Sequence, residues 1–149
     1  MTHQATQPGW RLMFRAAALF NWMAGFPLWF APVQLSRMFG FEPVPDHTLY
    51  TDLFAVLVIT FGIGYWKVGG NLVRNRVMIE MGICGKLLVV LVGYYHYLAG
   101  TTSLPFAMLV SGDLIWALLF LRFLRLHPEH PVPATRLHAA PDDLEQRCA

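Results

Sequence analysis

Residues 77–99 read VMIEMGICGKLLVVLVGYYHYLA, and Glu80 and Lys86 are the only Asp, Glu, Lys or Arg side chains in this run. A helix rises about 1.5 Å per residue, so a run of this length exceeds the roughly 30 Å hydrocarbon core of a bilayer. We therefore expect residues 77–99 to cross a membrane as one helix.

Three further stretches, residues 16–33, 49–66 and 104–121, are apolar and long enough to do the same. The whole chain is 56% hydrophobic and 13% charged, whereas an average soluble domain is about a quarter charged. The sequence therefore predicts an all-α fold, an antiparallel four-helix bundle in a membrane. This excludes a soluble enzyme and a secreted disulfide scaffold, and the net charge of +2 is too small for a nucleic-acid binder. The four stretches contain only four charged residues, namely Asp52, Glu80, Lys86 and Asp113.

Polar segments flank the apolar region at both ends. We expect residues 1–10 to be disordered, residues 11–125 to form the transmembrane domain, and residues 126–149 to be a polar cytoplasmic tail with one short helix at residues 142–146. The first apolar run is too long for a secretory signal and has no cleavage site, so it is interpreted as a retained span that begins near Trp10.

Prolines and short loops divide the transmembrane domain. The first helix should bend or end around Pro27 and Pro32, because proline removes a backbone donor and clashes with the preceding turn. Residues 34–41 predict a short amphipathic helix in the membrane interface. The loop at residues 100–103 is short enough to make the last two helices antiparallel neighbours.

The basic residues predict how the chain is oriented in the membrane. Arg37 would lie on the opposite side of the membrane from seven other basic residues. The positive-inside rule then places both termini on the cytoplasmic side of a bacterial inner membrane. Aromatic residues near the span ends, Tyr65 among them, are typical of the interface. The seven residues expected inside are Arg11, Arg15, Lys67, Arg74, Arg76, Arg122 and Arg125.

Lys86 and Asp113 require an explanation, since a charge at the bilayer centre costs about 2.5 to 3.5 kcal/mol. Counting residues places Lys86 roughly 13 Å and Asp113 about 17 Å from the same boundary, a gap that a lysine side chain can cover. We predict a buried ion pair, with Asn21 at similar depth as a further hydrogen-bond partner. Gly82 and Gly93 share a helical face with Lys86 and allow another helix to approach.

This pair could fix helix register, or it could move a proton or hold a polar group of a ligand. Asp52 and His96 could form a second site nearer the outer side, but capping of the second helix by Asp52 is the preferred interpretation. Glu80 lies close to Arg74 and Arg76 and is better explained by a salt bridge than by catalysis.

The motif His127-Pro-Glu129-His130 lacks a third strong ligand at fixed spacing, so no metal site is predicted. No cofactor is assigned. The ligand-binding candidates are therefore Asn21, Lys86 and Asp113, and the catalytic candidates are Asp113, Lys86, Glu80, Asp52 and His96.

Five short motifs are spread along the chain: Phe20-Asn21, Leu28-x-Phe30-x-Pro32, Gly62-x-Gly64-Tyr65, Gly82-x-x-Gly85-Lys86 and Gly112-Asp113-Leu114-Ile115-Trp116. Together they resemble a group of small four-span bacterial membrane proteins similar to the DoxX-like family. The resemblance covers about residues 14–124 and implies a four-helix fold with the lysine and the aspartate at its polar centre. Members often have Asn or Asp before that aspartate, and Gly112 departs from this pattern.

DoxX-like proteins include subunits of quinone-linked oxidoreductases. We therefore expect an accessory or binding protein that holds a lipophilic molecule such as a quinone or lipid, or that assists a larger membrane complex, as a possible homodimer in contact with membrane lipids. The alternative is an intramembrane isomerase or cyclase with Asp113, Glu80 or Asp52 as general acid. An apolar cavity beside Asp113 would favour binding or catalysis, and a tightly packed midplane would favour a structural subunit. A four-span proton-coupled transporter would have to dimerise.

Overall fold

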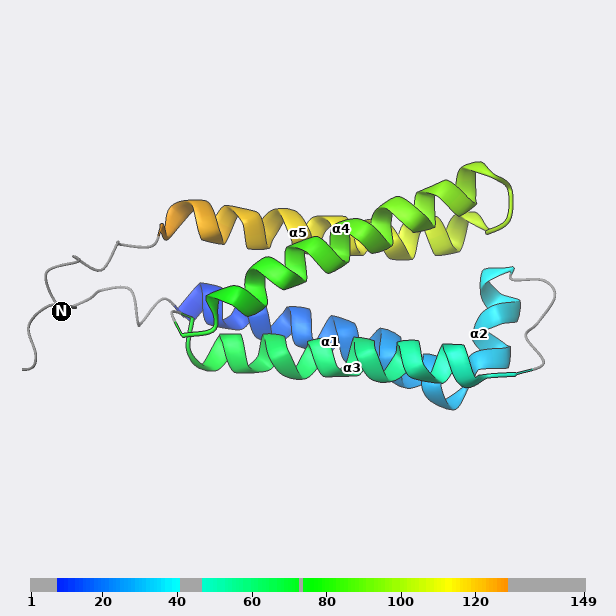
Figure 1. Ribbon diagram of the computed structural model, residues 1–149, viewed down its shortest axis with the longest axis horizontal. Coiled ribbons are helices and arrows are strands. Elements are labelled where there is room, and N and C mark those ends of the chain that lie inside the picture. Colours follow the sequence, from blue (N-terminus) through cyan, green and yellow to red (C-terminus); the bar gives the residue numbers. More distant parts are fainter. Residues whose placement is uncertain (1–7, 41–46, 73, 129–149) are drawn as a thin grey trace, which may run out of the picture.

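The computed structural model describes residues 8–40, 47–72 and 74–128, and these are almost entirely helical (Figure 1). The described residues contain no strand, so the predicted all-α class is confirmed. The predicted helix at residues 142–146 lies outside the described residues. The five helices are α1 (Pro8–Phe30), α2 (Pro32–Phe39), α3 (Leu49–Gly70), α4 (Arg76–Leu98) and α5 (Leu104–Leu126).

The first helix begins at Pro8 and ends at Phe30, two residues before Pro32. It starts at Pro8, inside the stretch expected to be disordered, where proline is well tolerated because the first helical N–H has no intrahelical partner. It continues through Pro27, whose carbonyl accepts a hydrogen bond from Ala31 N at 2.8 Å. α2 then begins at Pro32 and leaves at 109°, which confirms the predicted break.

Helices α3, α4 and α5 are each long and apolar enough to cross a membrane. α1 meets the same criterion only when the bent pair of α1 and α2 is taken as one span. The described residues thus form three to four helices that can span a bilayer, and the chain is a multi-pass membrane protein.

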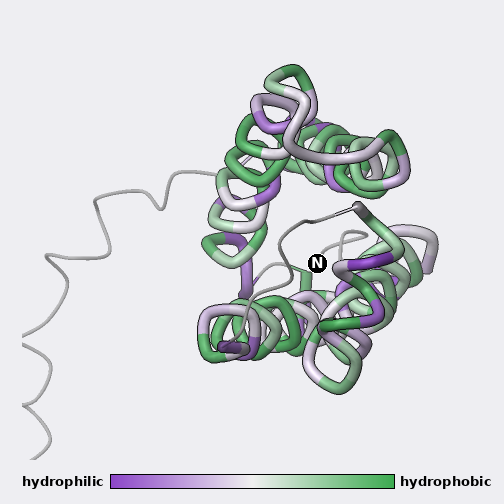
Figure 2. The backbone as a smooth tube through the Cα atoms, turned by 90° about the vertical axis from the view of Figure 1, so that its right-hand side faces the viewer, coloured by the Kyte–Doolittle hydropathy of each residue, from purple (hydrophilic) through white to green (hydrophobic). Residues whose placement is uncertain are grey.

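The four long helices form two pairs, α1 with α3 and α4 with α5, which appear as two layers when viewed from the α2 end (Figure 2). In the first pair, glycine allows close approach, because a Cβ built at Gly69 would lie 3.0 Å from the Arg11 carbonyl oxygen. Trp22 packs over Gly62 and donates from Nε1 to the Ile59 carbonyl at 3.2 Å. This contact surface explains why α3 continues to Gly70, past the predicted end at Trp66.

Aromatic side chains join the two pairs at the terminal end of the bundle, which is the end where α1 begins and α5 finishes. The ring of Phe14 lies 4.9 Å from that of Phe120 and 5.3 Å from that of Phe123, and the ring of Tyr65 lies 5.0 Å from that of Phe120. α4 contacts α3 near their connecting loop and then diverges from it (Figure 1). The packed core therefore fills the terminal half of the bundle.

At the opposite end, the α2 end, the short helix α2 connects the two pairs. Ser103 Oγ, at the start of α5, donates a hydrogen bond to the Phe39 carbonyl at 2.5 Å. The Phe39 and Phe106 rings meet edge to face at 5.9 Å. α2 is thereby held against α5, close to the loop that joins α4 to α5.

Candidate functional site: a buried ion pair and an apolar cavity

Lys86 lies where all four long helices meet. Its ammonium forms an ion pair with Asp113 Oδ1 on α5, as predicted from the two depths. Lys86 is 5% exposed, and the Asp113 side chain is 20% exposed. The short loop at residues 100–103 makes α4 and α5 neighbours. The two helices thus bring the two charges together in the middle of the bundle.

Asn21 completes the polar contacts of the lysine from α1. Its Oδ1 accepts a hydrogen bond from Lys86 Nζ at 3.2 Å, and its Nδ2 donates to the Val58 carbonyl on α3 at 3.2 Å. Asn21 is 7% exposed, so both groups of its amide are used inside the bundle. The predicted third member of the cluster is therefore confirmed as a hydrogen-bond partner.

Two aromatic rings, which sequence reasoning did not assign to this cluster, flank the lysine. Lys86 Nζ lies 5.5 Å from the ring centroids of both Phe20 and Tyr65, a cation–π distance. Tyr65 is 1% exposed, so its predicted place in the membrane interface is wrong. The reason is that α3 extends one further turn, which moves Tyr65 from a helix end into the core.

Two glycines make room for these rings. A Cβ at Gly82 would lie 2.7 Å from the Tyr65 hydroxyl oxygen, and a Cβ at Gly112 would lie 2.9 Å from the Phe20 ring. The prediction that Gly82 admits a neighbouring helix is confirmed, with α3 as that neighbour. Gly112, which departs from the resemblance, has a packing role: it accommodates Phe20 beside Asp113.

The remaining charged candidates lie outside the cluster. Asp52 lies in the first turn of α3, where the helix dipole favours an anion as predicted, and its Oδ2 accepts a hydrogen bond from Thr48 Oγ1 at 2.9 Å. No side-chain hydrogen bond caps the backbone N–H groups at this helix start. His96 contacts Thr101 instead of Asp52, so these two candidates are not brought together. Glu80 forms an ion pair with Arg76 at 3.2 Å, as predicted.

The histidine at the end of α5 has structural contacts. His127 Nδ1 lies 2.9 Å from the Phe123 carbonyl, and its ring stacks on Phe123 with centroids 4.5 Å apart. Its carbonyl accepts a hydrogen bond from Arg76 at 2.6 Å. Glu129 and His130, the other members of the sequence motif, lie outside the described residues.

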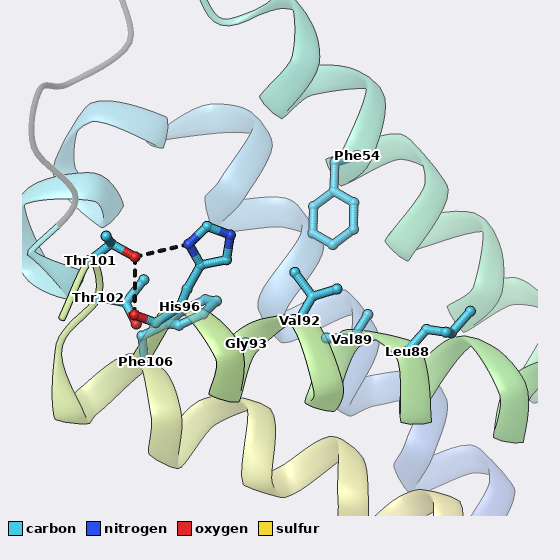
Figure 3. Close-up of a pocket in the computed structure, with 9 residues that line it drawn as sticks. All are labelled: Phe54, Leu88, Val89, Val92, Gly93, His96, Thr101, Thr102 and Phe106. Carbon is cyan, nitrogen blue, oxygen red and sulfur yellow. Dashed lines mark hydrogen bonds between the residues drawn. The ribbon is translucent and has the colours of Figure 1, made fainter. Parts of the chain in front are cut away.

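An apolar cavity of about 510 Å³ lies in the half of the bundle nearer α2, where α4 diverges from α3 (Figure 3). It is an open groove, since its lining residues Phe54, Leu88 and Val92 are 46%, 57% and 51% exposed. Leu88 and Val89, within one turn of Lys86 on α4, line the end of the cavity toward the ion pair, and Phe54 of α3 faces α4 from the other layer. None of Asn21, Lys86 and Asp113 is among its lining residues. The described lining consists of Phe54, Leu88, Val89, Val92, Gly93, His96, Thr101, Thr102 and Phe106.

The polar cluster and the cavity thus occupy successive levels along the bundle axis. Most residues that line the cavity gave no signal in the sequence, because an apolar residue facing a cavity and one facing lipid look alike. His96 was singled out, but for a contact with Asp52 that does not form. This chain matches no known protein family, no curated protein and no solved structure.

Proposed function

We propose that this protein is a membrane-embedded binding protein that holds a lipophilic small molecule, such as a quinone or a lipid, in the cavity between α3 and α4. The observation that carries the proposal is the cavity of about 510 Å³ with mainly aliphatic and aromatic lining. Ligand pockets typically have volumes of about 300 to 1,000 Å³ and a predominantly apolar lining.

The buried ion pair supports this proposal indirectly. Lys86, Asp113 and Asn21 connect three helices at the level below the cavity, so they hold the two layers together where the layers begin to diverge. In this proposal the cluster lies next to the Leu88–Val89 end of the binding site and does not contact the ligand. The ligand contacts come from the lining residues, and the cluster maintains the spacing of the helices.

The alternative is an intramembrane enzyme that uses a carboxylate as general acid. A general acid must come within hydrogen-bond reach of its substrate. Among the described residues that line the cavity there is no Asp or Glu. The lining therefore favours binding over carboxylate catalysis, and the DoxX-like resemblance with its quinone-linked subunits favours the same class.

The test is native mass spectrometry of the full chain purified in mild detergent, with two tryptophan variants on one helix. Val89→Trp puts an indole into the cavity, whereas Leu91→Trp puts the same indole on a surface where the parent side chain is 67% exposed. We expect a lipophilic adduct on the parent and on Leu91→Trp, and a strongly reduced adduct on Val89→Trp. Equal adducts on all three, or no adduct on the parent, would contradict the proposal.

A further inference from the structure

The terminal end of the bundle carries a positive charge that the described residues do not balance. Seven basic side chains lie at this end, and Glu80 is the only acidic residue there in the described part of the chain, where it pairs with Arg76. The other two described acids are elsewhere, since Asp52 lies at the start of α3 and Asp113 pairs with Lys86 in the middle of the bundle. This end therefore attracts anions.

Arg15 of α1 is held against α3 at this end. A Cβ built at Gly69 would lie 3.0 Å from the Arg15 Cγ, so the aliphatic part of the side chain lies across the glycine. The guanidinium carbon lies 5.2 Å from the centroid of the Trp66 ring, a cation–π distance. Trp66 lies about one turn before the end of α3 at Gly70, so the ring holds the charge inside the span end.

Trp66 is in turn supported by Trp22 of α1. The two ring centroids are 5.7 Å apart, and Trp22 Nε1 donates to the Ile59 carbonyl at 3.2 Å. Arg15, Trp66 and Trp22 thus form a row along the α1–α3 pair that runs from the terminal end toward the middle of the bundle. Trp66 is 44% exposed and Arg15 is exposed, so a lipid can reach both.

The guanidinium of Arg15 has hydrogen-bonding capacity that the described residues do not use. Its five N–H donors make no hydrogen bond or ion pair within the described segments. Its neighbour Arg11, by contrast, donates to the Gly70 carbonyl at 2.5 Å. An arginine in a membrane span is costly unless it is paired, and the planar guanidinium matches the oxygens of a phosphate with two parallel hydrogen bonds. The position of Arg15 therefore suits a phosphate group.

We infer that Arg15 binds the phosphate of an anionic phospholipid, with an acyl chain of the same lipid along Trp66 and Trp22. Such a lipid matches both parts of the row, because its phosphate faces the guanidinium and its hydrocarbon contacts the rings. A free phosphate ion matches only the first part. A zwitterionic lipid brings an ammonium group close to Lys67, the residue next to Trp66, and is repelled. This site shares no residue with the described lining of the cavity, so the inference does not rest on the proposed function.

The experiment is native mass spectrometry of the full chain in mild detergent, titrated separately with phosphatidylglycerol and with phosphatidylcholine of identical acyl chains. We expect the parent to bind phosphatidylglycerol about tenfold more tightly, as one charge-assisted hydrogen bond can provide. Arg15→Gln should lower this ratio to about two. Arg122→Gln is the matched control, because it removes one positive charge from an exposed side chain at the same end of α5 and should keep most of the preference.

A second variant separates a positioned guanidinium from charge alone. Trp66→Leu keeps the charge of Arg15 but removes the ring beneath it, so the ratio should fall about threefold. A ratio unchanged in Trp66→Leu, or equal losses in Arg15→Gln and Arg122→Gln, would overturn the inference, as would equal affinities of the parent for the two lipids. A preference lost in Val89→Trp and kept in Arg15→Gln would also overturn it, by placing the lipid in the cavity. Excess inorganic phosphate should not displace the lipid, and displacement would show that the site recognises phosphate without acyl chains.

Discussion

At the scale of single residues, Lys86 shows how a membrane bundle accommodates a buried ammonium. Asp113 provides the opposite charge, Asn21 an amide oxygen at 3.2 Å, and Phe20 and Tyr65 the faces of two rings at 5.5 Å. These partners come from three different helices, so the desolvation cost of the charge is offset only when the bundle is assembled. The lysine thereby makes correct packing of all four helices a condition for its own burial.

Removing one partner of this pair should strand the other. We expect Lys86→Met and Asp113→Asn each to lower the free energy of unfolding by about 3 to 5 kcal/mol, because each leaves a buried polar or charged group without its partner. The double variant should recover much of this loss. Thermal unfolding of the four proteins in one detergent measures the effect, and single variants as stable as the parent would contradict it.

The double variant also separates the two roles that the sequence left open. If the pair only fixes helix register, ligand retention should return together with stability. If the charges of the pair are also needed to shape the neighbouring cavity, stability should return while the adduct in native mass spectrometry stays reduced. The same samples therefore provide both measurements.

Replacing Thr102 should not lower the stability of the protein, in contrast to the single variants of the ion pair. Its buried hydroxyl has no partner in the described part of the chain, and valine has nearly the same shape without the hydroxyl. We expect Thr102→Val to leave the melting temperature of the ligand-free protein unchanged or to raise it, since a desolvated group is removed and no hydrogen bond is lost. A clear fall in melting temperature would show that the hydroxyl already has a structural partner.

Among residues, the ion pair was predictable and its aromatic environment was not. Helix rise is regular, so counting along two helices joined by a short loop gives relative depth within about one turn. The place of Tyr65 depends instead on where α3 ends and on which of its faces meets α4. Gly82, one turn from Lys86, was the available signal for a close neighbour, but it does not identify that neighbour.

At the scale of helices, the glycines of α3 and α4 differ in what surrounds them. A Cβ at Gly62 would collide with the Trp22 indole, whose Nε1 bonds the Ile59 carbonyl. A Cβ at Gly85 would meet nothing within 4 Å. The same substitution should therefore have opposite effects at the two positions.

We expect Gly62→Ala to lower the free energy of unfolding by about 1 to 3 kcal/mol, because the added methyl overpacks the α1–α3 contact. Gly85→Ala is the matched control and should be neutral or stabilising by up to about 1 kcal/mol, since alanine favours the helix. Thermal unfolding in the same detergent checks both. Equal effects at the two positions would indicate that α1 and α3 do not pack through Gly62.

Some helix boundaries were predictable from the sequence and others were not, as with the residues of the ion pair and the rings around it. The break at Pro32 and the turn at residues 100–103 were predicted, because proline and a short polar loop act locally. The extension of α3 through Gly69 and Gly70 was not, since glycine alone predicts a helix end. Packing of Gly69 against the backbone of α1 overrides that preference, and this contact is invisible without the fold.

At the scale of the whole molecule, the arrangement of two helix pairs creates the cavity. α4 starts beside α3 after a short connection and crosses away from it toward the α2 end (Figure 1). If all four long helices ran parallel to one another, the core would be packed evenly along its whole length. The sequence contains the lengths of the helices but not their crossing angles, so neither the cavity nor its lining was predictable.

The distribution of charge over the assembled bundle leads to the last prediction, that both termini face the cytoplasm. The structure places the start of α1, the end of α3, the start of α4 and the end of α5 at one end, and these segments carry seven basic residues. Arg37 lies on α2 at the other end. Because basic residues near span ends are retained on the cytoplasmic side, the terminal end should face inward and the cavity should open in the outer half of the bilayer. A reporter that needs the periplasm should be inactive when fused after Ala149 and active when inserted at residues 100–103, and the reverse pattern would invert both the topology and the side from which the cavity is reached.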